Sequence, residues 1–115
     1  ATAPPMDSIS VIELKSLLDG SADEVGLLDV RNPAEAEVAV IPGAVLMPLA
    51  TIKSGEAIER IRGMAETGRL YVHCKLGGRS AQAVELLAEQ GITATNVDGG
   101  IDAWSVQVDQ AVPRY

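Results

Sequence analysis

Short apolar runs alternate along the chain with segments in which apolar residues recur at helical spacing. EVGLLDV at 24–30 and RLYVHC at 69–74 are bounded by polar or turn residues, as buried parallel strands are. TATNVDGG at 93–100 predicts a third strand, AVLMP at 44–48 a weaker fourth, and MDSIS at 6–10 an edge strand. The pattern therefore predicts one sheet to which all five segments contribute.

Helix signals lie between these runs. Ser10 and Glu13 have capping-box spacing, and apolar residues then repeat at helical intervals until Gly20, which predicts a helix. Asn32 followed by Pro33 predicts the start of a short second helix. Further helices are expected within 55–67, from about 80 to 90, and in GGIDAW at 99–104. Strands that alternate with helices at this spacing predict an α/β fold on a mostly parallel sheet.

Composition narrows the class of protein. The chain has 115 residues, the length of one domain, and 47% of them are apolar with few aromatics. A net charge of −7 without a Lys/Arg block argues against nucleic-acid binding. No apolar run reaches the roughly 20 residues that span a bilayer, and no signal-peptide pattern opens the chain, which predicts a cytoplasmic protein without a membrane anchor. Residues 1–7 are expected to be a linker or N-terminal extension, and 8–115 a single domain.

Cys74 is the only cysteine, and no Cys/His cluster has the spacing of a metal site. It ends a predicted central strand, at the edge where open α/β sheets bind ligands. Gly77 and Gly78 allow successive backbone N–H groups to converge on one point. These amides, the dipole of the next helix and the cations Lys75 and Arg79 would stabilise a thiolate, which predicts a nucleophile with a lowered pKa. A buried, unreactive cysteine is the competing interpretation.

Two features next to Cys74 separate possible chemistries. His73 would point to the opposite face of the sheet, so we expect it to pack or to form hydrogen bonds rather than to act as the base of a Cys/His pair. Cys74 and Arg79 are separated by four residues, one fewer than the Cys-to-Arg spacing of cysteine phosphatases. The shorter loop favours a bound sulfur atom over a phosphoryl group.

Four segments together resemble the rhodanese family of sulfurtransferases. CKLGGRS at 74–80 is similar to the family's CxxGxRS active loop, LLDVRNPAE at 27–35 to its DVR element, IPGAVLMP at 41–48 to its IPGA element, and VDGGIDAW at 97–104 to its GG-and-Trp element. They occur in the family's order over most of the chain. The ending VDQAVPRY also resembles the close of rhodanese domains fused behind E1-like adenylyltransferases.

The resemblance implies a rhodanese-like fold, with a five-stranded, mostly parallel sheet flanked by helices on both faces. It implies a sulfurtransferase that uses a Cys74 persulfide and needs neither cofactor nor metal. The sulfur would come from a small donor such as thiosulfate or from a cysteine desulfurase. It would pass to a thiophilic acceptor, which in molybdopterin-type pathways is the activated C-terminus of a small ubiquitin-like sulfur-carrier protein, with an adenylyltransferase domain fused to this one.

The resemblance also implies which residues act. Cys74 would be the catalytic residue, and the rest of the active loop would bind the donor or the persulfide sulfur: Lys75, Leu76, Gly77, Gly78, Arg79 and Ser80. Lys75 and Arg79 would attract an anionic donor and stabilise the leaving sulfite. Asp29 and Arg31 follow the neighbouring strand, where they either pair with the active loop or only tie that strand to the next helix.

Three further positions are expected to be structural. Trp104 should pack in the core with its indole N–H hydrogen-bonded. Glu35 is expected to be an acid in the first turn of a helix and no more. Val40 stands where the family often has His, outside the active loop, so this difference bears on local packing rather than on sulfur transfer.

Two other functions stay open. A non-catalytic rhodanese-like docking module would use the same fold, although such modules commonly lack the cysteine. A Cdc25-like or arsenate-reductase-like enzyme would also use it, with an active loop one residue longer than the loop in this chain.

Overall fold

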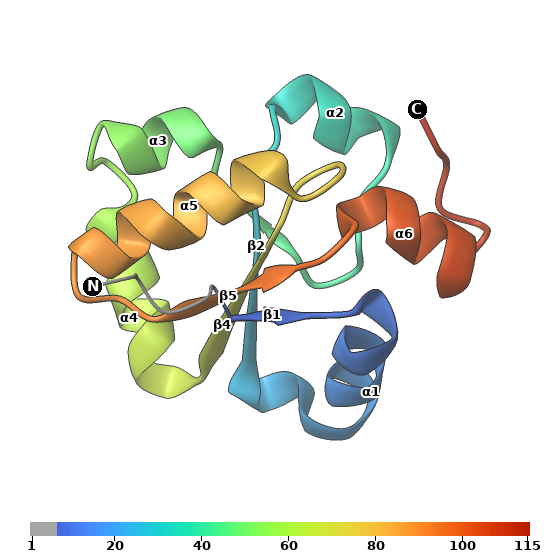
Figure 1. Ribbon diagram of the computed structural model, residues 1–115, viewed down its shortest axis with the longest axis horizontal. Helices are drawn as coiled ribbons and strands as arrows, with labels where there is room; N and C mark the ends of the chain where they lie inside the picture. Colours follow the sequence, from blue (N-terminus) through green and yellow to red (C-terminus); the bar gives the residue numbers. More distant parts are fainter. Residues whose placement is uncertain (1–6) are drawn as a thin grey trace, which may run out of the picture.

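A computed structural model describes residues 7–115, so the linker predicted at 1–7 lies, apart from Asp7, outside the described residues. Five strands form one sheet in the order β1-β5-β4-β2-β3 (Figure 1). They are β1 (Ser8–Ile9), β2 (Val25–Asp29), β3 (Val45–Leu46), β4 (Arg69–His73) and β5 (Ala94–Val97). All expected strands are present and every neighbouring pair is parallel, so the predicted sheet is confirmed.

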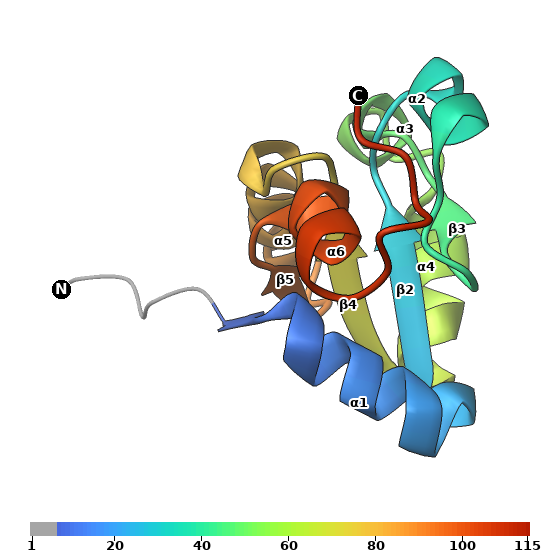
Figure 2. The same cartoon turned by 90° about the vertical axis from the view of Figure 1, so that its right-hand side faces the viewer.

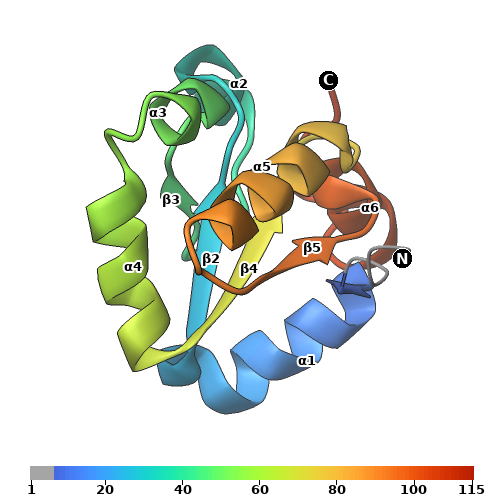
Figure 3. The same cartoon turned by 60° about the vertical axis from the view of Figure 1, so that its left-hand side comes forward.

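Helices cover both faces of the sheet. They are α1 (Val11–Ser21), α2 (Pro33–Val38), α3 (Leu49–Lys53), α4 (Ile58–Thr67), α5 (Gly78–Glu89) and α6 (Gly100–Gln107), with a 3-10 turn, η1 (Ala22–Glu24), after α1. Helices α1 and α6 pack on one face, and α3, α4 and α5 pack on the other (Figure 3). The C-terminal segment runs back from α6 toward α2 (Figure 2). None of the helices within 7–115 is long and apolar enough to cross a bilayer.

Two apolar clusters, one on each face, form the core. On β4, Leu70 and Val72 belong to the cluster under α4 and α5, whereas Tyr71 belongs to the cluster under α1 and α6. Neighbouring side chains of a strand point to opposite faces. A strand covered on both faces must therefore be apolar at nearly every position, which is why the run RLYVHC could be recognised as a central strand.

Helix ends follow the predicted signals with two exceptions. The Ser10–Glu13 capping box is formed, but α1 continues past Gly20 to Ser21. Helix α5 begins at Gly78, before the expected start near residue 80, because Gly77 adopts φ +122° and turns the chain directly into the helix. Helix α3 was not predicted, since five residues are too short to display a helical period.

Candidate active site

Cys74 follows the last residue of β4, the middle strand of the sheet, and the residue is 1% exposed. It belongs to the same apolar cluster as Val72 and Ala83, which places it on the face covered by α5. Residues 75–77 of the active loop then lead into α5, which begins at Gly78. The parallel strand thus places the sulfur at the carboxyl edge of the sheet, as the sequence predicts.

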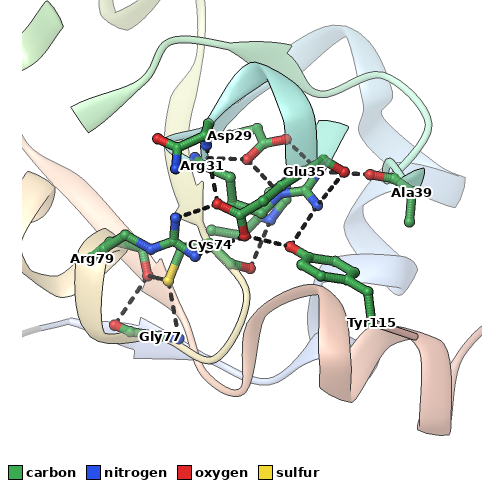
Figure 4. Close-up of polar contacts among 11 residues, drawn as sticks. Asp29, Arg31, Glu35, Ala39, Cys74, Gly77, Arg79 and Tyr115 are labelled. Carbon is green, nitrogen blue, oxygen red and sulfur yellow. Dashed lines mark hydrogen bonds and ion pairs between the residues drawn. The ribbon is translucent and has the colours of Figure 1, made fainter. Parts of the chain in front are cut away.

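The sulfur of Cys74 lies among hydrogen-bond donors. The backbone N–H of Gly77 donates to Sγ over 3.1 Å (Figure 4). The hydroxyl oxygen of Ser80 lies 3.4 Å from Sγ. Burial, the largest single influence, raises the pKa of the thiol. The Ser80 hydroxyl and the backbone N–H groups of Ser80, Gly77 and Leu76 together outweigh burial, so the pKa of Cys74 is lowered.

The start of α6 forms hydrogen bonds with the backbone of the active loop. Ile101 N–H donates to the carbonyl of Cys74 over 2.9 Å, and Asp102 N–H donates to the carbonyl of Lys75 over 3.1 Å. A side chain at Gly100 would not fit, because an added Cβ would lie 2.4 Å from the carbonyl oxygen of Cys74. The glycine pair of VDGGIDAW therefore allows α6 to bind the backbone of the loop.

His73 is not the base of a Cys/His pair. Its Nδ1 lies 3.2 Å from the backbone oxygen of Cys74, and its Nε2 has no hydrogen-bond partner within the described chain. Burial lowers the pKa of His73, which keeps the imidazole neutral near pH 7. The packing role predicted from strand alternation agrees with this position. Trp104 is buried as expected. Its indole N–H has no hydrogen-bond partner among residues 7–115, so the prediction that it is hydrogen-bonded is wrong.

Glu35 does more than cap a helix, which corrects the expectation from the sequence. It accepts from the backbone of Asn32 and also forms a two-pronged ion pair with Arg79, with Nη1–Oε1 and Nη2–Oε2 distances of 2.5 and 3.0 Å. The Arg79 hydrogen bond lowers the pKa of Glu35 to about 2 despite burial. Glu35 in turn raises the pKa of Arg79, and attraction to the Cys74 thiolate adds to this rise although burial opposes it. Helix α2 thus positions Arg79, one of the two cations of the active loop.

Tyr115 connects the C-terminal segment to the same cluster, and sequence reasoning did not identify it. Its hydroxyl donates to Glu35 Oε2 over 2.7 Å and accepts from Arg31 Nη1 over 2.9 Å. The ammonium of Lys75 lies 4.7 Å from the centre of the Tyr115 ring, a cation–π distance. The only signal for this role was the ending VDQAVPRY, which resembles the end of related domains.

Asp29 and Arg31 tie strand β2 to helix α2. Both are buried, and their side chains form an ion pair with an Nη2–Oδ2 distance of 2.6 Å. Arg31 also donates to the backbone carbonyl of Ala39 beyond the end of α2. Within residues 7–115 neither side chain bonds directly to the active loop. Of the two interpretations, the structural one is therefore supported, with an indirect link to the loop through Tyr115.

Asn96 is a second residue that the sequence did not reveal. It is a buried polar residue on β5, and its Oδ1 lies 2.6 Å from Ser80 Oγ. Its Nδ2 lies 3.5 Å from the carbonyl oxygen of Gly77. The available signal was a polar residue inside a strand that is mostly buried. No group of three or more His, Cys, Asp or Glu residues in the described part of the chain is arranged to bind a metal ion.

The fold and this site define an α/β domain that presents a buried, amide-bound cysteine at the carboxyl edge of a parallel sheet. The chain belongs to the Rhodanese-like domain family, whose family model matches residues 10–107. The crystal structure of a rhodanese-like domain protein from Staphylococcus aureus is 35% identical, with a TM-score of 0.75 over 96% of this chain and 99% of that chain. Human single-domain sulfurtransferase TSTD1 is 28% identical, with a TM-score of 0.72 over 90% and 98%.

Two curated relatives are longer proteins. The chain is 36% identical to the probable adenylyltransferase/sulfurtransferase MoeZ of Mycobacterium tuberculosis, over 100% of this chain and 29% of that protein. It is 33% identical to the adenylyltransferase and sulfurtransferase MOCS3 of Bos taurus, over 96% of this chain and 28% of that protein. The chain therefore corresponds to less than a third of each of these relatives.

Proposed function

We propose that this domain is a sulfurtransferase that carries sulfane sulfur as a persulfide of Cys74. The observation that supports it most is the hydrogen bonding of Sγ by the active loop, which lowers the pKa of the thiol without a histidine. A loop of this length surrounds a sulfur atom and is short for a phosphoryl group. The names of MoeZ, MOCS3 and human TSTD1 point to the same class of activity.

The first half-reaction charges the cysteine. The Cys74 thiolate attacks the outer sulfur of thiosulfate, a new S–S bond forms, and the S–S bond of the donor breaks with its electron pair leaving on sulfite. The N–H groups of Leu76, Gly77 and Ser80 would stabilise the anionic outer sulfur of the persulfide. Lys75 and Arg79 would attract the anionic donor and the leaving sulfite, since both are cations of the active loop.

In the second half-reaction the persulfide of Cys74 gives up its outer sulfur. A thiophilic acceptor attacks the outer sulfur, the persulfide bond breaks, and the electron pair returns to Cys74 as a thiolate. Cyanide serves as acceptor in an assay and yields thiocyanate. Neither step needs a proton donor, which agrees with a neutral His73 on the opposite face.

The longer relatives support a proposal about the physiological partner. In the proposed pathway a cysteine desulfurase or a small molecule supplies the sulfur, and the activated C-terminus of a small sulfur-carrier protein receives it. An adenylyltransferase domain fused to this one would activate that C-terminus, as the double names of MOCS3 and MoeZ suggest. A cytoplasmic location belongs to the same prediction.

Intact-mass spectrometry tests the proposed function. After incubation with thiosulfate, the wild-type chain should gain the mass of one sulfur atom and lose it when cyanide is added. Cys74→Ser retains the size of the side chain and should gain nothing. The proposal fails if the wild type takes up no sulfur or if the variant takes it up equally well. Faster turnover of an aryl phosphate than of thiosulfate would favour a phosphatase instead.

A further inference from the structure

The Ser80 hydroxyl carries one proton and has three possible acceptors around it. Its oxygen lies 2.6 Å from Asn96 Oδ1, 3.1 Å from the carbonyl oxygen of Gly77 and 3.4 Å from Cys74 Sγ. A serine hydroxyl donates one hydrogen bond and accepts up to two. Only one of the three acceptors can therefore receive the proton at a time.

Of the three acceptors, Asn96 Oδ1 is the one that has no other hydrogen-bond donor in the described part of the chain. The carbonyl of Gly77 already accepts from the backbone N–H of Ala81 at 3.1 Å and lies 3.5 Å from Asn96 Nδ2. Asn96 Oδ1 is buried and, in the described part of the chain, accepts from Ser80 alone. An uncharged Cys74 then donates its S–H proton to Ser80, and Ser80 donates to Asn96.

Loss of the thiol proton changes the acceptor that competes for the Ser80 proton. The thiolate attracts the Ser80 proton, because a charged acceptor forms the stronger hydrogen bond. If the hydroxyl turned to sulfur, two oxygen atoms 2.6 Å apart would face each other without a proton between them. Rotation of the Asn96 amide by half a turn would place Oδ1 where Nδ2 now lies, 3.5 Å from the carbonyl oxygen of Gly77. The rotation would therefore replace an attractive contact with Gly77 by a repulsive one between two oxygen atoms.

We propose that Asn96 is a positioning residue that retains the Ser80 proton and so withholds it from the Cys74 thiolate. Asn96 touches neither Sγ nor a substrate and acts only through Ser80. The Ser80 hydroxyl, 3.4 Å from Sγ, then lowers the pKa of Cys74 only in part, and the thiolate depends mainly on the loop amides. It remains more basic than it would be if the hydroxyl proton were given wholly to the sulfur. A more basic thiolate attacks a donor sulfur faster but leaves a persulfide more slowly. This consequence for the two half-reactions rests on the proposed function.

Titration of the single thiol tests the role of Asn96 directly. The ultraviolet absorbance of the thiolate is followed against pH, with Cys74→Ser as the blank. Asn96→Ala frees the Ser80 proton and should lower the midpoint by about one pH unit, a tenfold change in thiolate fraction below the midpoint. Asn96→Leu, of nearly the same shape but without an acceptor, should do the same if the alanine variant folds poorly. Thr95→Ala is the matched control, because its side chain points to the opposite face of β5.

A double-variant cycle separates this role from a merely structural one. In a Ser80→Ala background there is no proton to withhold, so Asn96→Ala should leave the midpoint unchanged. An unchanged or raised midpoint for Asn96→Ala and Asn96→Leu, or an equal shift in the Ser80→Ala background, would overturn the proposal.

Sulfur chemistry is measured separately. The persulfide of Asn96→Ala should discharge to cyanide several-fold faster than that of the wild type, and the variant should charge more slowly from thiosulfate above the midpoint. The titration needs no sulfur donor. If the wild type took up no sulfur while the midpoints still shifted, the proposed function would fail and the role of Asn96 would stand.

Discussion

At the scale of single residues, the loop cations are positioned by side chains that lie far away in sequence. Arg79 is bound by Glu35, and Lys75 lies over the ring of Tyr115. The hydroxyl of Tyr115 bridges Glu35 and Arg31. Tyr115 thus contacts Lys75 through its ring and reaches Arg79 indirectly, because its hydroxyl binds the carboxylate of Glu35.

Two substitutions of Tyr115 separate these contacts. Tyr115→Phe keeps the ring but removes the two hydrogen bonds of the hydroxyl, one to Glu35 and one from Arg31. This loss should cost about 1 kcal/mol and lower kcat/KM for thiosulfate about fivefold. Tyr115→Leu also removes the cation–π contact and should lower it by a further factor of roughly two to five. Steady-state transfer of sulfur from thiosulfate to cyanide gives both values. Arg62→Ala breaks a surface ion pair on α4 and is the control, which should retain the kinetics of the wild type. Kinetics equal to those of the wild type in both Tyr115 variants would contradict the expectation.

At the scale of elements, α6 holds the active loop in place. Its first N–H groups bind the carbonyls of Cys74 and Lys75, and Gly100 makes room for this approach. Helix α5 starts directly after Gly77, which brings the N–H of Ser80 to the sulfur. The geometry around Sγ is therefore the joint product of β4, α5 and α6.

Gly100→Ala tests this arrangement. The added Cβ would lie 2.4 Å from Cys74 O and 2.5 Å from Lys75 O, at a residue with φ +57°. We expect the free energy of unfolding, measured with urea, to fall by about 1–3 kcal/mol. The thiol midpoint should rise as the loop is displaced.

Gly63→Ala is the matched control for Gly100→Ala. Gly63 lies inside α4 with open space around it, so this variant should gain about 0.5–1 kcal/mol in stability. Equal stability of the two variants would refute the close approach at Gly100.

At the scale of the whole molecule, one network of polar side chains joins distant parts of the chain at the carboxyl edge of the sheet. It contains the end of β2, helix α2, the start of α5 and the C-terminal segment, through Arg31, Glu35, Arg79 and Tyr115. Because the pKa of Glu35 is lowered from 4.5 to about 2, ionised Glu35 stabilises the folded chain above its unfolded pKa. This contribution is lost as the pH falls from about 4.5 toward about 2.

Acid unfolding of Glu35→Gln tests the network. At about pH 7 this variant should be less stable than the wild type, because a neutral amide pairs more weakly with Arg79. Between pH 4.5 and about 2 it should lose less stability than the wild type, since it has no proton to take up at this position. Urea unfolding across this pH range measures both effects. Glu37→Gln, on the exposed part of the same helix, should follow the wild type; a parallel pH dependence of Glu35→Gln and the wild type would exclude the effect.

Patterns that repeat within a few residues could be interpreted from the sequence. EVGLLDV and RLYVHC predicted central strands because both of their faces are covered, and the capping box at Ser10 predicted the start of α1. The position of Cys74 and the turning of the loop amides toward it also follow from a strand, a glycine turn and a helix start in succession. Helix α3 was missed because its five residues contain too little of a period.

By itself, then, the amino-acid sequence determined the alternation of strands and helices, the place of Cys74 at the end of a central strand and the opposite direction of His73. Only the tertiary structure decided which side chains surround that cysteine. Glu35 meets Tyr115 across a sequence separation of 80 residues, and Ser80 meets Asn96 across 16. The physical reason is that periodicity tells which face of an element is buried, whereas the partner of a polar group on that face depends on how the packed elements bring distant residues together.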